Sequence, residues 1–257
     1  MAHQPIIQRA KRPRWPRRLA WLSVALLLAS AVLIAAAGPA YRMEMLPLGD
    51  AFSLLRYATY AAVAAAALGL VTLIAAAVKR RFGPGTVAVL VMAAAVALLY
   101  VPWQHWQRAQ AVPAIHDITT DMTNPPAFEA VANARRKAPN AVDYPGARTA
   151  EQQRAAYPEI QPLTVDAPPG TVLAAVQTEM QNAGWHIADV GPRRVEATAT
   201  TRWFGFKDDV VVRLSEKDGQ TRVDMRSASR LGKSDVGTNA ARIHTFLASL
   251  KARLHPR

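Results

Sequence analysis

Residues 226–239 hold the densest group of side chains that could do chemistry. These fourteen residues carry three cations, one carboxylate, four hydroxyls and two glycines, just before the last amphipathic stretch. If Ser234 or Asp235 leads into a helix, the free N–H groups of its first turn, with Arg230 and Lys233 nearby, would suit an anion. The carboxylate weakens this interpretation, because Asp235 as the N-cap would occupy those amides and repel an anion.

The same segment also predicts a structural role at a corner between the last strand and the last helix. We call this arrangement the clasp: a pair between Arg226 or Arg230 and one of Asp235, Asn239 or Asp208 fixes the corner. The clasp is favoured over the anion site because every helix needs partners for its first N–H groups.

Two adjacent carboxylates, Asp208 and Asp209, follow the aromatic loop at residues 203–206. Such a pair near aromatic rings could act as general acid and base or bind a hard cation. Neighbouring residues at the start of a strand point to opposite faces, however, so the two carboxylates are poorly placed to share one ligand. The aromatic residues of the loop are interpreted as a core plug or an interface contact.

Ser227 and Ser229 are the candidate nucleophiles of the segment. The chain has no Gly-x-Ser-x-Gly motif, and the spacing of His186 and His244 does not support a Ser-His-Asp assembly. We therefore assign no catalytic residue, no metal ligand and no cofactor. The residues kept as candidates for ligand binding are Asp208, Asp209, Arg226, Ser227, Ser229, Arg230, Ser234, Asp235 and Asn239.

An α+β domain must position these candidates. A helix is predicted from Asp166, its N-cap, to Gly184, where it stops. Strands with short turns follow at residues 185–190, 194–201, 209–214 and 222–227. Asp218-Gly219 between the last two is a strong hairpin signal, and a final helix covers about residues 236–253. This order predicts an antiparallel β-meander with two helices packed on one face.

Alternation along the strands separates two faces of the predicted sheet. The apolar face, directed at the helices, comprises Val195, Ala197, Ala199, Val210, Val212, Leu214, Val223 and Met225. The polar face comprises Glu196, Thr198, Thr200, Asp209, Arg213, Asp224 and Arg226. We expect the polar face to be solvated, with opposite charges paired across strands. The alternative is a docking surface for an acidic or zwitterionic partner.

Residues 104–162 are polar, contain seven prolines and show little periodicity. Such a composition predicts a linker or a wrapping arm. Within it, Pro125-Pro126 could begin a short helix that runs through Ala134, because proline is tolerated in a first helical turn.

Three apolar segments that lack Asp and Glu, residues 19–38, 57–78 and 86–101, approach the roughly 20 residues needed to cross a bilayer. Residues 1–111 hold 12 Lys and Arg but only 2 Asp and Glu, a net charge of +10, whereas residues 112–257 carry only +3. Because the basicity belongs to the membrane half, it does not indicate binding to nucleic acid. Without intramembrane ionisable groups the three segments are interpreted as an anchor integral to the lipid bilayer.

Lys and Arg cluster before the first apolar segment and between the second and third. By the positive-inside rule the N-terminus is cytoplasmic, and three crossings place everything after Val101 outside the cytoplasm. A signal peptide cleaved after Ala35-Ala36-Ala37 is the alternative for the first segment, although its apolar run is longer than usual. The chain has no cysteine, which is compatible with an oxidising compartment.

The predicted organisation therefore has four parts along the chain. They are a basic cytoplasmic tail at residues 1–18, a three-helix membrane anchor at residues 19–103, the Pro-containing linker or wrapping arm at residues 104–162, and the α+β domain at residues 163–257. The predicted location is the bacterial inner membrane, crossed several times, with the C-terminal domain in the periplasm.

Six segments of the C-terminal half form an ordered pattern. They are Ile115-His-Asp-Ile-Thr-Thr-Asp121, Asn124-Pro-Pro-Ala-Phe128, Tyr157-Pro-Glu-Ile-Gln-Pro162, Glu196-Ala-Thr198, Gly205-Phe-Lys-Asp-Asp-Val210 and Val223-Asp-Met-Arg-Ser-Ala-Ser-Arg-Leu-Gly-Lys-Ser-Asp-Val-Gly-Thr-Asn239. Over about residues 115–254 the chain resembles the bacterial domain-of-unknown-function family 1499. The resemblance implies no established reaction, cofactor or catalytic residue, and the hydrophobic N-terminal segments of family members agree with an anchored protein.

We therefore predict an inner-membrane-anchored envelope protein of unknown molecular function. Its extracytoplasmic domain is expected to bind a protein, lipid or cell-wall component rather than to act as an enzyme. The alternative is an extracytoplasmic hydrolase or other enzyme with a polar site around Asp208, Arg230 and Asp235. An enzyme requires these groups to converge in a concave, partly apolar cleft, whereas the clasp requires them to be paired with neighbouring groups.

Overall fold

A computed structural model describes residues 14–254 of the chain. The chain forms two compact units that divide between Trp103 and Gln104. Arg9, Lys11 and Arg12, on which part of the orientation argument depends, lie outside the described residues.

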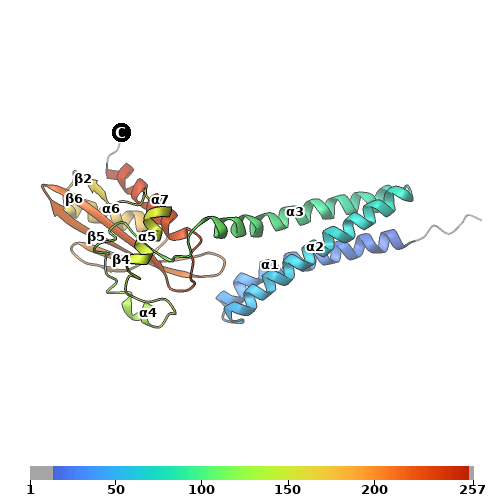
Figure 1. Ribbon diagram of the computed structural model, residues 1–257, viewed down its shortest axis with the longest axis horizontal. Helices are drawn as coiled ribbons and strands as arrows, with labels where there is room; N and C mark the ends of the chain where they lie inside the picture. The colour runs from blue at the N-terminus through green and yellow to red at the C-terminus, as the bar shows by residue number, and fades with distance from the viewer. Residues whose placement is uncertain (1–13, 255–257) are drawn as a thin grey trace, which may run out of the picture. The chain divides into compact units, whose positions relative to one another are not determined.

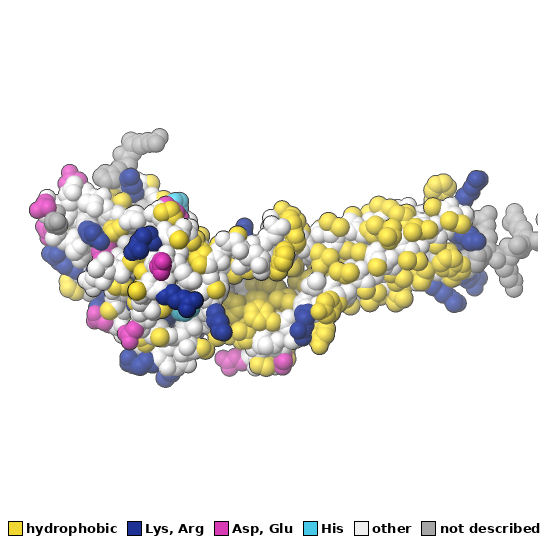
Figure 2. All heavy atoms as spheres, viewed as in Figure 1, with side chains coloured by type: hydrophobic (Ala, Val, Ile, Leu, Met, Phe, Trp, Pro, Cys, Tyr) yellow, Lys and Arg dark blue, Asp and Glu magenta, His cyan; other side chains and the backbone are white. Residues whose placement is uncertain are grey.

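The N-terminal unit is built from three long helices, α1 (Trp15–Arg42), α2 (Leu48–Val78) and α3 (Phe82–Ala111), the last of which continues into the second unit. Each helix is long and apolar enough to cross a membrane, and each contains one of the predicted segments. Small residues let the helices approach closely, since Ser30 Oγ on α1 donates a hydrogen bond to the carbonyl of Ala58 on α2. Larger apolar side chains point outward, and hydrophobic atoms cover the visible face of this unit (Figure 2).

The C-terminal unit contains a six-stranded antiparallel sheet in the order β1-β6-β5-β4-β3, with β2 also paired to β6 (Figure 1). The strands are β1 (Asp117–Thr119), β2 (Leu163–Val165), β3 (His186–Val190), β4 (Arg194–Thr200), β5 (Lys207–Lys217) and β6 (Gln220–Ser229). The predicted meander corresponds to β3 through β6. β1 and β2 extend it, because each adds three residues to the free edge of β6, with Asp117 opposite Ala228 and Leu163 opposite Val223.

Two helices, α6 (Pro169–Asn182) and α7 (Thr238–Leu254), pack on the apolar face of the sheet. Strand residues such as Val195, Val210 and Met225 are fully buried there against Val176 of α6 and Ile243 of α7. The predicted apolar face is thus confirmed. Burial of aliphatic side chains stabilises this side by about 1.5–3 kcal/mol for each fully buried one.

The backbone confirms the predicted hairpin turn and the predicted end of the first helix of the domain, and it corrects the predicted start of that helix. Asp218 and Gly219 both have positive φ (54° and 77°), as a two-residue hairpin requires, and Gly184 follows α6 with φ of 71°. The prediction of Asp166 as a helix N-cap is wrong. Helix α6 begins at Pro169 after Pro168, without a side-chain cap, because the two proline rings already fix φ for the first turn.

Residues 112–162, which we call the arm, begin along the edge of β6, where Ile115 and Ile118 join the helix-side core, and then cross the polar face of the sheet, where Val131 and Arg135 bond to Glu196 and Asp209. They include two short helices, α4 (Ala132–Arg136) and α5 (Ala147–Ala156), and in Figure 1 the strands lie between α4 and the pair α6 and α7. The helix predicted from Pro125 is wrong, because the chain becomes helical only at Ala132. The solvated polar face is also wrong, since Glu196 and Asp209 are fully buried and Arg226 is only 2% exposed.

Candidate functional site

The nine candidate residues divide between the two sides of the sheet. Asp208 and Asp209 point to opposite sides, as alternation along β5 predicts, and each meets a different arginine. Asp208 Oδ2 accepts a hydrogen bond of 2.6 Å from Arg242 Nη2 on α7, whereas Asp209 Oδ2 accepts one of 3.1 Å from Arg135 Nη1 in the arm. The two carboxylates therefore cannot act on one ligand together.

On the helix side, a polar chain joins the end of β6 to α7. Ser227 Oγ donates to Asn239 Oδ1 at 2.7 Å, and Asn239 Nδ2 donates to Ser229 Oγ at 3.0 Å and to the carbonyl of His116 at 3.0 Å. Arg242 Nη1 donates to Ser227 Oγ at 2.9 Å and to Asn239 Oδ1. Because Ser227, Ser229 and Asn239 are buried, these bonds are shielded from water and hold the corner together.

The start of α7 is capped by its own chain. Asp235 Oδ1 accepts the N–H of Gly237 at 2.8 Å, and Asp235 Oδ2 accepts the N–H of Asn239 at 2.8 Å. Ser234 Oγ accepts the N–H of Val236 at 3.2 Å. Burial raises the pKa of the Asp235 carboxyl above its ordinary value, and the two backbone N–H bonds oppose that shift. Asp235 thus occupies the amides that an anion would need.

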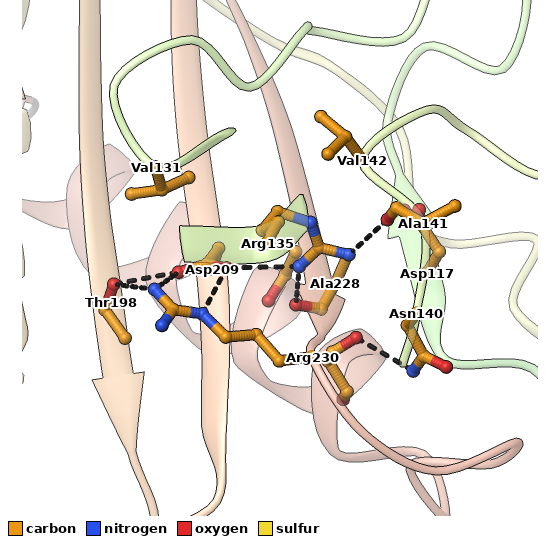
Figure 3. Close-up of polar contacts among 12 residues, drawn as sticks. Asp117, Val131, Arg135, Asn140, Ala141, Val142, Thr198, Asp209, Ala228 and Arg230 are labelled. Carbon is orange, nitrogen blue, oxygen red and sulfur yellow. Dashed lines mark hydrogen bonds and ion pairs between the residues drawn. The ribbon is translucent and has the colours of Figure 1, made fainter. Parts of the chain in front are cut away.

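On the arm side, Asp209 is the centre of a second polar cluster (Figure 3). Its Oδ1 accepts hydrogen bonds from Arg230 Nη2 at 2.7 Å and from Thr198 Oγ1 at 2.8 Å, and its Oδ2 accepts one from Arg230 Nε at 2.8 Å. Arg135 Nη1 approaches the same Oδ2 and also donates to the carbonyl of Ala228 at 2.9 Å. One carboxylate therefore joins the arm, β4, β5 and the end of β6.

Arg135 is fully buried and links the arm to itself as well as to the sheet. Its Nη2 donates to the carbonyl of Ala141 at 2.8 Å, and its guanidinium lies 4.8 Å from the ring centre of Phe128. Burial lowers the pKa of Arg135, and the charge of Asp209 offsets part of that shift. Removing Asp209 would leave a buried cation without its main partner.

Arg226 forms a third polar contact, again with the arm. Its Nε and Nη2 donate to the two oxygens of Asp117 at 2.9 and 2.7 Å, a bidentate geometry that strengthens the pair. Nη2 also donates to the carbonyl of Val142, and the guanidinium lies 4.5 Å from the ring centre of Phe128 and 5.6 Å from that of Tyr144. The cation is thereby enclosed between a carboxylate and two aromatic rings.

Another buried carboxylate of the sheet, that of Glu196, holds the arm through backbone N–H groups. Glu196 on β4 is fully buried, and its two oxygens accept the N–H groups of Glu129 at 2.9 Å and Val131 at 3.1 Å. Arg194 Nε lies 3.2 Å from Glu196 Oε1. The polar face of the sheet is thus matched to donors and acceptors of the arm rather than to solvent.

The expected clasp pairs Arg226 or Arg230 with Asp235, Asn239 or Asp208, and the structure gives each arginine another partner. Arg226 pairs with Asp117 and Arg230 with Asp209, because both side chains project to the arm side, away from α7. The corner itself is held by Arg242, which the sequence reasoning missed. Its position three residues after Asn239 is the one available signal, since such residues share a helix face. Arg135 and Asp117 lie in non-periodic segments that give no comparable signal.

An open groove of about 550 Å³ lies between the end of α6 and α7. Trp185 and Phe246, whose rings stack with centres 5.3 Å apart, line it together with Arg242, Thr245 and Glu179. None of the nine candidate residues is among the described residues that line the groove. Arg242 links the candidates to the groove, because its side chain bonds Asp208 and Ser227 and also forms part of the groove wall.

The fold and these contacts define the class of protein: three long apolar helices are followed in the chain by an antiparallel α+β domain, and buried charged residues of that domain bind the arm. The chain belongs to the family described as "Protein of unknown function (DUF1499)", which matches residues 117–250. This confirms the resemblance found in the sequence. The chain is also similar to a solved structure, CalU16 from Micromonospora echinospora, at 20% identity over 35% of this chain and 72% of that chain, with a TM-score of 0.25. Comparison with curated proteins gives no match.

Proposed function

We propose that the chain is a bacterial inner-membrane protein whose C-terminal domain lies in the periplasm and binds a protein, lipid or cell-wall component without catalysing a reaction. The orientation is supported by positive charge. Arg14, Arg17 and Arg18 precede or begin α1, and residues 79–81 between α2 and α3 are all Lys or Arg. The positive-inside rule assigns both regions, with the tail at residues 1–18, to the cytoplasm.

One observation carries the choice of binding over catalysis: the polar groups of the alternative enzyme site are bonded to separate internal partners. Asp208 is held by Arg242, Arg230 is held by Asp209, and Asp235 accepts two backbone N–H groups. A catalytic group must reach a substrate atom and keep a lone pair or proton available for it. Groups that are each paired with an internal neighbour support a structural role.

The groove between α6 and α7 is the surface that we assign to the ligand. Stacked Trp185 and Phe246 offer an apolar floor, while Arg242 and Thr238 offer donors at one end. Binding sites commonly combine such a floor with a few fixed polar groups. In this proposal Ser227, Ser229 and Asn239 contribute by orienting Arg242, and Asp208 keeps its guanidinium at the wall.

Copurification from membranes tests the proposal. The detergent-solubilised wild-type chain should carry a reproducible lipid, wall fragment or protein that mass spectrometry identifies, and Thr245→Arg, which fills the groove, should lose it. Ala248→Arg is the matched control, because residue 248 is exposed on the same helix but does not line the groove. A wild-type preparation without any such material, or equal retention by Thr245→Arg, would refute the binding model.

Orientation has a separate test. A reporter enzyme that is active only outside the cytoplasm should be active when it is fused after Arg257. Activity of a cytoplasm-only reporter at the same position would overturn the periplasmic location and leave the groove experiment unaffected.

A further inference from the structure

The turn between β4 and β5 presents a tryptophan outward. Trp203 is 41% exposed, whereas its neighbour Phe204 is buried. The Phe204 ring stacks on Phe206 with centres 4.9 Å apart, and Trp203 meets Phe204 edge-on at 4.9 Å. The two phenylalanines therefore form a base that supports the tryptophan at the surface.

Hydrogen bonds fix the shape of this turn. The N–H of Thr201 donates to the carbonyl of Phe206 at 2.9 Å, and the N–H of Phe206 donates to Thr201 Oγ1 at 2.9 Å. The N–H of Gly205 donates to the carbonyl of Thr201 at 3.0 Å, with Gly205 at φ of 71°. Because the turn is ordered in advance, little conformational entropy is lost when Trp203 contacts a partner.

Exposed cations surround the turn. Arg202 and Lys207 flank it, and the N–H of Arg230 donates to the carbonyl of Lys207, which brings the loop with exposed Lys233 to the same end of the sheet. Of the acidic residues nearby, Asp208 and Asp209 are buried in the internal pairs described above, and half-buried Asp235 is bonded to the first amides of α7. The surface at this end is therefore aromatic and basic.

The chain enters the domain at this same end of the sheet. The N–H of Ser229 donates to the carbonyl of His116, and the N–H of Asp235 donates to the carbonyl of Ile115, so the segment after α3 lies beside the end of β6. Eight helical residues and three non-helical ones separate Trp103 from Ile115, a path of roughly 25 Å at most. The chain path between an apolar helix and this end of the sheet is thus short.

We propose that the β4–β5 turn docks on the lipid bilayer that holds the anchor, with Trp203 at the level of the headgroups and Arg202, Lys207 and Lys233 against anionic lipid. Tryptophan concentrates at membrane interfaces, and basic side chains beside it are attracted to anionic headgroups. Docking rests on the membrane anchoring within the proposed function. It depends neither on which side of the membrane the domain occupies nor on the ligand of the groove.

The absence of cysteine from the chain permits a direct test with single labels. Thr200→Cys places a fluorophore at an exposed position beside the turn and outside the proposed contact, and Gln220→Cys places the same fluorophore at the exposed hairpin end of β6. The full chain is reconstituted into nanodiscs that contain phosphatidylglycerol and headgroup-spin-labelled lipid. Quenching is expected at position 200 and not at position 220. Equal quenching at both positions, or none at 200, overturns the docking.

Substitutions at the surface itself sharpen the test. In the Thr200→Cys background, Lys207→Gln and Lys233→Gln should each lower the ratio of docked to undocked chains about fivefold, and Trp203→Ser should lower it further. Lys251→Gln, an equal charge loss near the end of α7, should leave quenching unchanged. Equal effects of all three lysine variants would contradict a local contact. Activity of a cytoplasm-only reporter fused after Arg257 would refute the periplasmic location alone. Docking would be unaffected, because quenching measures closeness to the headgroups on either side of the membrane.

Discussion

The two faces of the sheet are closed in different ways. On the helix side, aliphatic residues such as Met225 and Ile243 pack against one another, whereas on the arm side Asp117, Asp209 and Glu196 are buried against donors. Apolar packing tolerates many partners, while a buried carboxylate requires a donor at a defined distance and angle. The density of charge on the second face therefore reflects attachment of the arm, not an exposed site.

Met225 and Arg226 allow the two sides to be compared at neighbouring positions. Both lie in β6, both are at most 2% exposed, and their side chains enter opposite layers. Substitutions at these two positions therefore test the apolar and the polar layer within one strand. Each effect is a change in the free energy of unfolding of the C-terminal unit, measured by urea pulse proteolysis on the detergent-solubilised full chain.

Arg226→Ala should have the largest effect, a loss of about 3–5 kcal/mol, because it leaves the Asp117 carboxylate buried without its partner. The control replaces both members with apolar residues of similar volume, Asp117→Leu with Arg226→Met, and should retain most of the stability. A loss below about 1 kcal/mol for Arg226→Ala would show that the pair is not desolvated as the structure indicates.

Met225→Ala should lower stability by about 2–5 kcal/mol through the cavity that it creates among aliphatic neighbours. Met225→Leu, which preserves volume, should cost less than about 1.5 kcal/mol. The comparison breaks if Met225→Leu is as damaging as Met225→Ala, because the helix side would then depend on specific geometry as the arm side does.

Asn239→Ala should lower stability by about 1–3 kcal/mol, because Ser227, Ser229 and Arg242 all lose a buried hydrogen-bond partner. Thr238→Ala, at an exposed neighbouring position, should stay within about 0.5 kcal/mol of wild type. Full stability of Asn239→Ala would contradict the structural role of the corner.

Tyr144 gives the smallest effect and a defined pH window. Burial raises the pKa of Tyr144 to about 12 from 10, and its hydroxyl makes no hydrogen bond among the described residues. The folded chain therefore holds this proton more tightly than the unfolded chain, so its contribution is complete below pH 10 and is lost as pH rises through about 12. Tyr144→Phe should match wild type at neutral pH and lose less stability above pH 10. Identical alkaline profiles would contradict the shift.

The sequence contained enough information for the elements but not for their polar partners. Alternation in β4, β5 and β6 predicted which residues share each face, because nondirectional burial repeats along an element. The arm has no such repeat. β1 contributes three residues, and Arg135 reaches Asp209 across 74 positions of the chain, a separation that only the folded register determines. For the same reason the predicted clasp had the right location and the wrong partners.

The most direct test of the account is a double-mutant cycle between Arg135 of the arm and Asp209 of β5. Arg135→Met, Asp209→Asn and the combined variant are compared with wild type by urea pulse proteolysis. If the arm is held by buried pairs, the coupling energy should be at least about 1 kcal/mol, within the range of groups in direct contact. Effects that add to within about 0.3 kcal/mol would show that the two groups are independent and would contradict the internal role assigned to the polar face.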